Sequence, residues 1–82
     1  MPTLIIKRKF FDAIIDGEKT IEYRDRSEYY DKLFEGKKIK YIKLLCQQDV
    51  IFCDLVKKKK GWGKWMLYIR VRWWNCNATD PL

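Results

Sequence analysis

Histidine is absent from this 82-residue chain, so the side chain that most often moves protons near neutral pH is missing. Any acid–base chemistry must therefore use lysines or carboxylates. The only cysteines, Cys46, Cys53 and Cys76, form no CxxC pair. The sequence thus predicts neither a zinc site nor a disulfide framework, and it implies no cofactor. We expect reduced thiols, which are typical of a cytoplasmic protein.

Long apolar runs are also absent. None approaches the roughly 20 residues that a membrane span needs. The short apolar run near the amino end is followed at once by Lys7, Arg8 and Lys9, unlike the apolar core of a signal peptide. We expect a cytoplasmic protein that does not contact membranes.

Aromatic and cationic residues, by contrast, are abundant. Hydrophobic residues make up 48% of the chain and aromatic residues 16%, which indicates a dense core rather than disorder. We expect one domain over residues 3–74 and a carboxyl-terminal tail over 75–82. The net charge of +7 is uneven: residues 1–36 carry seven Lys/Arg against eight Asp/Glu, whereas residues 37–82 carry eleven against three. A surface of this kind attracts nucleic acid, although lysines also serve simply to keep a small protein in solution.

Hydrophobic periodicity predicts five strands and two short helices. The strands are expected at 3–7, 20–25, 38–46, 49–56 and 64–74. A helix around 10–15 ends at Gly17, and a second over 28–35 begins after Ser27 as its cap and ends at Gly36. The order β-α-β-α-β-β-β predicts an α+β fold, namely a small five-stranded β-barrel with one or two short helices.

Two details concern the carboxyl half. Residues 57–63, KKKKGWG, are predicted to be a solvated turn. In the last strand Trp65, Leu67, Ile69 and Val71 share the apolar face, and one of the two tryptophans that follow at 73 and 74 should continue it while the other points outward.

The helix stop at Gly17 opens the run Gly17-Glu18-Lys19-Thr20-Ile21-Glu22-Tyr23-Arg24. Glu22 and Arg24 are two residues apart on a strand and project from one face, and Lys19 emerges where that strand starts. The run therefore predicts an amine, a carboxylate and a guanidinium at one barrel mouth. Lys19 and Arg24 would hold a phosphate, Arg24 in a bidentate manner. An exposed cross-strand charge cluster without function is the simpler alternative.

The run matches a G-x-K-x-x-E-x-R pattern in every position, and residues 4–25 resemble the opening of ASCH domains. The continuation through residue 45 is similar to short prokaryotic and phage-type members. The resemblance implies a fold like that of the PUA domains, which bind RNA, and nucleic-acid binding through Lys19, Glu22 and Arg24. One ASCH branch hydrolyses acetylcytidine with a Lys and a Thr, but here Glu22 stands at the position of that threonine, so that mechanism is not expected.

Other residues extend the predicted nucleic-acid surface. Lysines bind phosphate and an exposed indole stacks on a base, so the candidates beyond the run are Lys58, Lys59, Lys60, Trp62 and Arg70.

Three functions stay open. The first is a module that binds RNA or a modified nucleotide. The second is a metal-independent ribonuclease or nucleoside-processing hydrolase with Lys19 and Glu22 as acid and base. The third is a protein-binding inhibitor or decoy that uses exposed tryptophans, and such tryptophans also suggest a homodimer.

Overall fold

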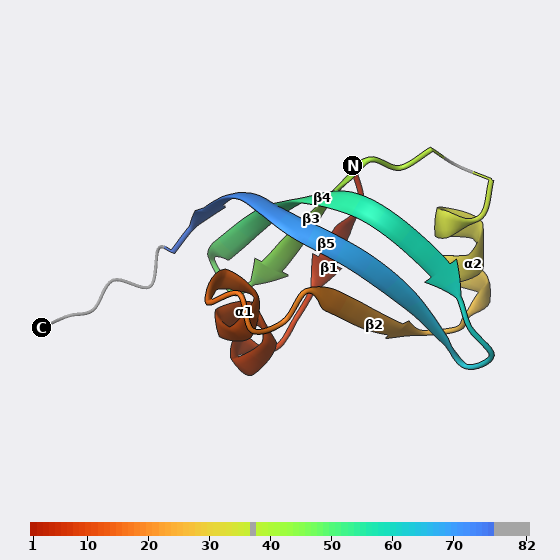
Figure 1. Cartoon of the computed structure of the whole chain (residues 1–82), viewed down its shortest axis with the longest axis horizontal. Helices are drawn as coiled ribbons and strands as arrows, with labels where there is room; N and C mark the ends of the chain where they lie inside the picture. The colour runs from red at the N-terminus through yellow and green to blue at the C-terminus, as the bar shows by residue number, and fades with distance from the viewer. Residues whose placement is uncertain (37, 77–82) are drawn as a thin grey trace, which may run out of the picture.

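The computed structural model describes residues 1–36 and 38–76. Seven elements follow one another within them (Figure 1): β1 (Thr3–Ile5), α1 (Arg8–Ile15), β2 (Ile21–Asp25), α2 (Glu28–Phe34), β3 (Tyr41–Cys46), β4 (Asp49–Lys60) and β5 (Lys64–Asn75). The predicted order β-α-β-α-β-β-β is therefore confirmed over the described part of the chain. Of the tail predicted over 75–82, Asn75 still belongs to β5, Cys76 is exposed, and 77–82 lie outside the described residues.

The five strands form one mixed sheet in the order β1-β3-β4-β5-β2. β1 runs parallel to β3, and the other neighbours are antiparallel. The sheet curls into a half-barrel with α1 near one end and α2 near the other (Figure 1), so the α+β barrel-like fold is confirmed in this coarser form. β1 and β2 are the two edges of the sheet. We call the opening between these two edges the seam.

The core lies on the inner face of the curled sheet. Alternate residues of β3, β4 and β5 point inward, and Phe11 and Ile14 of α1 and Phe34 of α2 close over them. The predicted apolar face of β5 is confirmed: Trp65, Leu67 and Ile69 are buried, and Val71 is partly buried against the core. These large rings and branched side chains supply the apolar area that an 82-residue domain needs.

The helix ends follow local signals. Ser27 caps α2, since its hydroxyl accepts a hydrogen bond from the Tyr30 N–H at 3.1 Å. Gly17 and Gly36, after the two helices, have φ angles of +83° and +71°, which favour glycine. Both predicted stops are thus confirmed.

The lysine run was predicted to be a turn, and this is wrong for most of it. Lys57 to Lys60 belong to β4 and pair with β5 from Tyr68 to Trp65. The turn contains only Gly61, Trp62 and Gly63. The strand extends because the β5 backbone offers a partner along this whole length, and tertiary pairing of this kind overrides the weak strand propensity of lysine.

Two bulges interrupt the β4–β5 ribbon. In one, Leu55 and Lys57 of β4 pair with the consecutive Ile69 and Tyr68, so Val56 is the extra residue. In the other, Arg72 is the extra residue of β5, between the partners of Phe52 and Cys53. Bulges bend a ribbon and increase its twist.

The second bulge decides where the two tryptophans lie. Trp73 pairs with Phe52 on the outer face, and Trp74 pairs with the buried Ile51 at the strand end. Both remain about half exposed.

No helix among the described residues is long and apolar enough to cross a membrane.

Candidate functional site

The turn after α1 positions Lys19. Gly17 donates its N–H to the Ile14 carbonyl, and the N–H groups of Glu18 and Lys19 both donate to the Ala13 carbonyl, at 2.9 and 3.1 Å. These bonds satisfy carbonyls of the last helical turn that have no partner within the helix. Lys19 therefore starts β2 from a fixed point at the end of α1.

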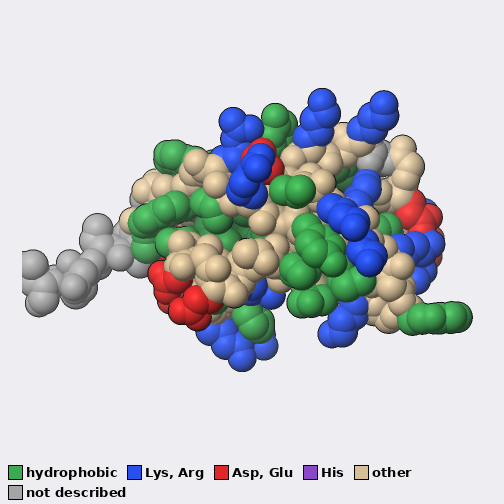
Figure 2. All heavy atoms as spheres, viewed as in Figure 1, with side chains coloured by type: hydrophobic (Ala, Val, Ile, Leu, Met, Phe, Trp, Pro, Cys, Tyr) green, Lys and Arg blue, Asp and Glu red, His purple; other side chains and the backbone are tan. Residues whose placement is uncertain are grey.

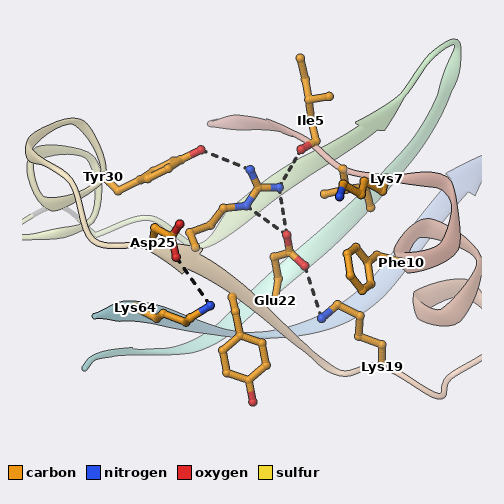
Figure 3. Close-up of a pocket in the computed structure, with 11 residues that line it drawn as sticks. Ile5, Lys7, Phe10, Lys19, Glu22, Asp25, Tyr30 and Lys64 are labelled. Carbon is orange, nitrogen blue, oxygen red and sulfur yellow. Dashed lines mark hydrogen bonds and ion pairs between the residues drawn. The ribbon is translucent and has the colours of Figure 1, made fainter. Parts of the chain in front are cut away.

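β2 turns its polar face inward. Glu22 is only 5% exposed, and Tyr23, on the opposite side of the strand, is exposed. Glu22 Oε1 lies 3.5 Å from Lys19 Nζ, and Glu22 Oε2 lies 2.9 Å from Arg24 Nη2. The predicted gathering of amine, carboxylate and guanidinium is thus present, and Figure 3 shows Lys19 and Tyr30 on opposite sides of Glu22.

Arg24 spans the seam. Its Nε donates to Glu22 at 3.0 Å, Nη1 donates to the Tyr30 hydroxyl at 3.3 Å, and Nη2 donates to the Ile5 carbonyl at 2.8 Å. One guanidinium thereby joins β2 to the end of β1 and to α2. The bidentate edge predicted for a phosphate is engaged by Glu22 instead, so Arg24 serves first as the brace that holds the carboxylate and the two sheet edges in place.

A hollow of about 970 Å³ lies beside this brace. We call it the seam hollow. Its walls combine four cations, two carboxylates, three aromatic rings and two isoleucines: Lys7, Lys19, Arg24 and Lys64; Glu22 and Asp25; Phe10, Tyr23 and Tyr30; Ile5 and Ile6. It is therefore both cationic and aromatic, and it has the size of small-molecule sites.

Lys19 lies between two of these rings. Its ammonium is 5.0 Å from the Phe10 ring centre and 5.3 Å from the Tyr23 ring centre. Both distances are within the range of cation–π attraction. The rings and the carboxylate together fix the amine at the wall of the hollow.

The other predicted binding residues do not line the seam hollow. Lys58 donates to the Phe34 carbonyl at the end of α2, and Lys60 pairs with Glu35. Arg70 lies on the outer face, 2.9 Å from Asp54, whose pKa its hydrogen bond lowers.

Lys59 and Trp62 are exposed near the tip of the β4–β5 hairpin. Trp62 is fully exposed and lies at the opposite end of β5 from Trp73 and Trp74, so the three tryptophans form no single anchor surface.

Sequence reasoning predicted three of the lining residues and did not place the other eight at this site: Ile5, Ile6, Lys7, Phe10, Tyr23, Asp25, Tyr30 and Lys64. Phe10 of α1 is 37% exposed and lines the hollow. Lys64 enters because β5 pairs it with Asp25 of β2, across 39 residues of sequence, and the two side chains lie 3.6 Å apart. Only the pairing of β2 with β5 reveals it.

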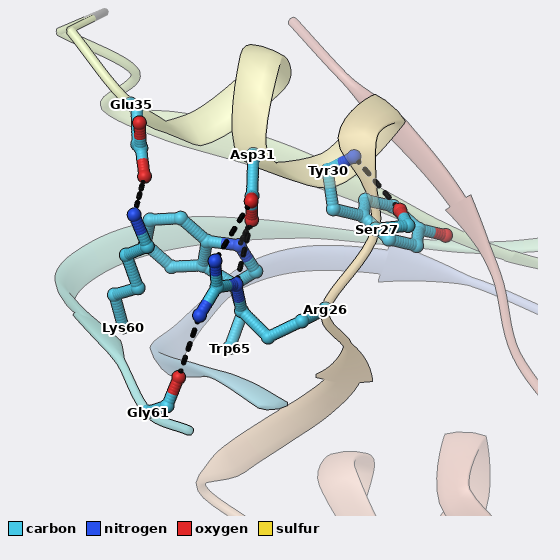
Figure 4. A network of polar contacts seen from close by, with 8 residues as sticks. All are labelled: Arg26, Ser27, Tyr30, Asp31, Glu35, Lys60, Gly61 and Trp65. Atoms are coloured by element: carbon cyan, nitrogen blue, oxygen red, sulfur yellow. Dashed lines mark hydrogen bonds and ion pairs between the residues drawn. The ribbon is translucent and has the colours of Figure 1, made fainter. Parts of the chain in front are cut away.

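Sequence reasoning also missed a polar network beneath the hairpin tip (Figure 4). Asp31 accepts hydrogen bonds from Arg26 Nε and from the Trp65 indole, both at 2.8 Å. Arg26 also donates to the Gly61 carbonyl at 3.0 Å. The bonds from Arg26 and then from Trp65 lower the pKa of Asp31 from 3.8 to about 2. This network fastens α2 and the tip to the end of β2.

A second buried carboxylate lies at the far end of the sheet. Asp49 is fully buried and accepts hydrogen bonds from Arg8 Nη2 at 2.7 Å and from the Cys76 thiol at 3.0 Å. It holds α1 against the β3–β4 turn and is a structural pair. Among the described residues no group of His, Cys, Asp and Glu has the arrangement of a metal site.

Comparisons with known proteins give no relative: no family model, no curated protein and no solved structure matches this chain.

Proposed function

We propose that the seam hollow binds a nucleotide, either within RNA or as a modified nucleotide, and that the chain is a nucleic-acid-binding module of the ASCH, PUA-like type. One observation carries the proposal. A buried carboxylate, Glu22, is held between Lys19 and Arg24 at the wall of a cationic, aromatic hollow. Burial of these charges has a large desolvation cost, and a ligand site gives a reason for that cost.

The cations suit a phosphate. Lys7, Lys19 and Lys64 line the hollow, whereas Arg24 is committed to the brace. Lysine ammonium groups bind phosphate as point charges without a fixed geometry. The phosphate is therefore expected to contact these lysines, and Lys19 in particular because it is fixed.

The rings and Glu22 suit a base. Phe10 and Tyr23 present partly exposed faces at the hollow, and base–aromatic stacking contributes about 1–3 kcal/mol per base. A carboxylate accepts hydrogen bonds from exocyclic amino groups of bases. Glu22 is fixed by its two cations and would distinguish amino-bearing bases from others.

The test is fluorescence anisotropy with short single-stranded RNA and with labelled mononucleotides. Lys19→Ala should weaken binding of the mononucleotides at least tenfold. Lys32→Ala removes the same charge from an exposed position that does not line the hollow, and it should leave the affinity within twofold. Glu22→Gln keeps the shape of the side chain and should alter the preference among bases.

Two results would refute the proposal. If no binding is detected at about 50 mM salt, where phosphate contacts are strongest, the hollow has no nucleotide to hold. Equal affinities of Lys19→Ala and Lys32→Ala would also show that the charge at the hollow is irrelevant.

A second function, hydrolysis of RNA or of a nucleoside, is favoured by one distance. Lys19 Nζ and Glu22 Oε1 are 3.5 Å apart, within reach of one reacting group, and both face the hollow. General acid–base catalysis requires each of the two groups to lie within hydrogen-bond reach of the proton that it transfers. Turnover by purified protein that disappears in Glu22→Gln would support this function, and turnover that persists in that variant would assign it to a contaminant.

A further inference from the structure

A second surface lies on the outer face of the sheet, away from the seam hollow. Tyr41 of β3, Phe52 of β4 and Trp73 of β5 come from adjacent strands. Phe52 pairs with Trp73 in the β4–β5 ladder, and the two ring centres are 5.4 Å apart. We call the surface of these three rings the outer platform.

The platform is open. Tyr41 is 43% exposed and Trp73 is 53% exposed. A groove of about 360 Å³ runs between the rings and includes none of the residues that line the seam hollow; Met1, Tyr41, Phe52, Cys53, Arg72 and Trp73 form it. The two sites therefore do not share a wall.

Cations alternate with the rings. The Lys43 ammonium lies 5.7 Å from the centre of Phe52, and the Arg72 guanidinium lies 5.4 Å from the centre of Tyr41. Figure 2 shows Lys and Arg side chains projecting from several parts of the visible surface, with Asp and Glu in few places.

The carboxylate next to the platform, Asp54, is already neutralised. Arg70 lies 2.9 Å from it and Arg72 lies 3.2 Å from it, and both arginine side chains remain more than half exposed. The local charge is therefore positive, with Lys43, Arg70 and Arg72 against one carboxylate.

We propose that the outer platform binds single-stranded nucleic acid, with successive bases stacked on Tyr41, Phe52 and Trp73 and with phosphates at the neighbouring cations. A protein partner would find apolar area here, but it would have to match three cations. A strand of phosphates and bases is complementary to both the charge and the rings. The site is independent of the seam hollow and goes beyond the function proposed for it.

The bulge at Arg72 supports this assignment. Strict alternation after Val71 would turn residue 73 toward the core. The extra residue instead places Trp73 opposite Phe52 on the outer face and leaves Arg72 beside Tyr41. Bulges recur where a side chain must be re-aimed.

The experiment measures binding of a labelled ten-nucleotide single strand, made as RNA, as DNA and as a DNA strand that lacks bases. Wild-type protein should bind the two base-bearing strands at least tenfold more tightly than the abasic strand. Trp73→Ala and Tyr41→Ala should each weaken binding of the base-bearing strands at least fivefold. Equal affinity for RNA and DNA means that bases and phosphates suffice, and a preference for RNA adds a contact to the 2′-hydroxyl; both support the platform.

Val56→Ala is the matched control, since Val56 is an exposed apolar residue of β4 without a ring. It should bind within twofold of wild type. Tyr41 and Trp73 lie on different strands. If circular dichroism shows that one of the two alanine variants is unfolded, the other variant still tests the proposal. Lys19→Ala separates the two sites: it should weaken mononucleotide binding at least tenfold and leave the preference for base-bearing over abasic strands intact.

The proposal is overturned if the abasic strand binds as tightly as the others, or if both ring variants bind like Val56→Ala. It is also overturned if sedimentation shows a dimer that Trp73→Ala dissociates and that the strand does not displace, because a second copy would then cover the platform.

Discussion

Arg24 offers the sharpest test of how the seam is held. Its guanidinium donates to Glu22, to Tyr30 and to the Ile5 carbonyl, and only 17% of the side chain is exposed. Arg24→Met keeps much of the apolar stem and removes all three bonds. It also leaves the buried Glu22 with Lys19 alone, at 3.5 Å.

The expected magnitude follows from that loss. Removing one partner of a buried ion pair costs about 3–5 kcal/mol. Because the hollow admits water and Lys19 remains, we expect the lower end, about 3 kcal/mol. In a domain of this size each kcal/mol lowers the melting temperature by about 4–8 °C. Thermal unfolding followed by circular dichroism should therefore show a decrease of at least about 12 °C.

A double-mutant cycle separates the brace from generic packing. Arg24→Met leaves the buried Glu22 carboxylate without its main partner, and Glu22→Gln removes that negative charge. The free energy of unfolding of the double variant should therefore be about 1–2 kcal/mol higher than that of Arg24→Met alone. Lys32→Met, at an exposed pair with Glu28, should leave the melting temperature unchanged. If Arg24→Met melts like Lys32→Met, or if the effects of the two seam substitutions simply add, the guanidinium does not brace the seam.

Three further predictions concern other parts of the fold. Because the pKa of Asp31 is lower in the folded protein, its ionised carboxylate stabilises the fold above about pH 4, and this stability is lost as the pH falls toward about 2. In acid-unfolding curves, Asp31→Asn and Arg26→Gln should therefore lack the decrease in stability between about pH 4 and about pH 2. Burial raises the pKa of the Cys53 thiol to about 12; at about pH 8 a thiol reagent should therefore modify the exposed Cys76 in native protein, and early modification of Cys53 would contradict its burial. Gly17→Ala should destabilise by about 1 kcal/mol in urea unfolding, because an alanine is strained at a φ of +83°; the added methyl has no neighbour within 4 Å beyond the adjacent residues. An unchanged midpoint would show that the turn relaxes freely.

Local signals predicted the elements well. Ser27, Gly17 and Gly36 act within one helical turn of themselves, and alternation in β5 depends only on neighbouring residues, so the sequence contains what is needed to predict them. The gathering of Lys19, Glu22 and Arg24 is also local, since it follows from a helix stop and a strand period of two.

The rest depends on contacts between distant residues. Whether Glu22 faces inward depends on which side of β2 the curled sheet encloses, and β2 takes its place only by pairing with β5. Lys58 and Lys60 became strand residues because β5 pairs with them and the end of α2 receives their amines. The indole of Trp65 finds Asp31 across 34 positions. No window of sequence contains both partners of such contacts.

The two bulges of the β4–β5 ribbon carry one extra residue each, Val56 on one strand and Arg72 on the other. Their offsets cancel along the ribbon, so the strands stay in step at both ends while the middle bends. A single-codon deletion of either residue would leave every pair of the ladder and the faces of the strand beyond it unchanged, because each is the extra residue of its bulge, but it would remove that bulge and the bend that it introduces. Natural variants of this chain that lack Val56 or Arg72 should therefore keep the same residues on each face of the ribbon and differ in how strongly the ribbon curls.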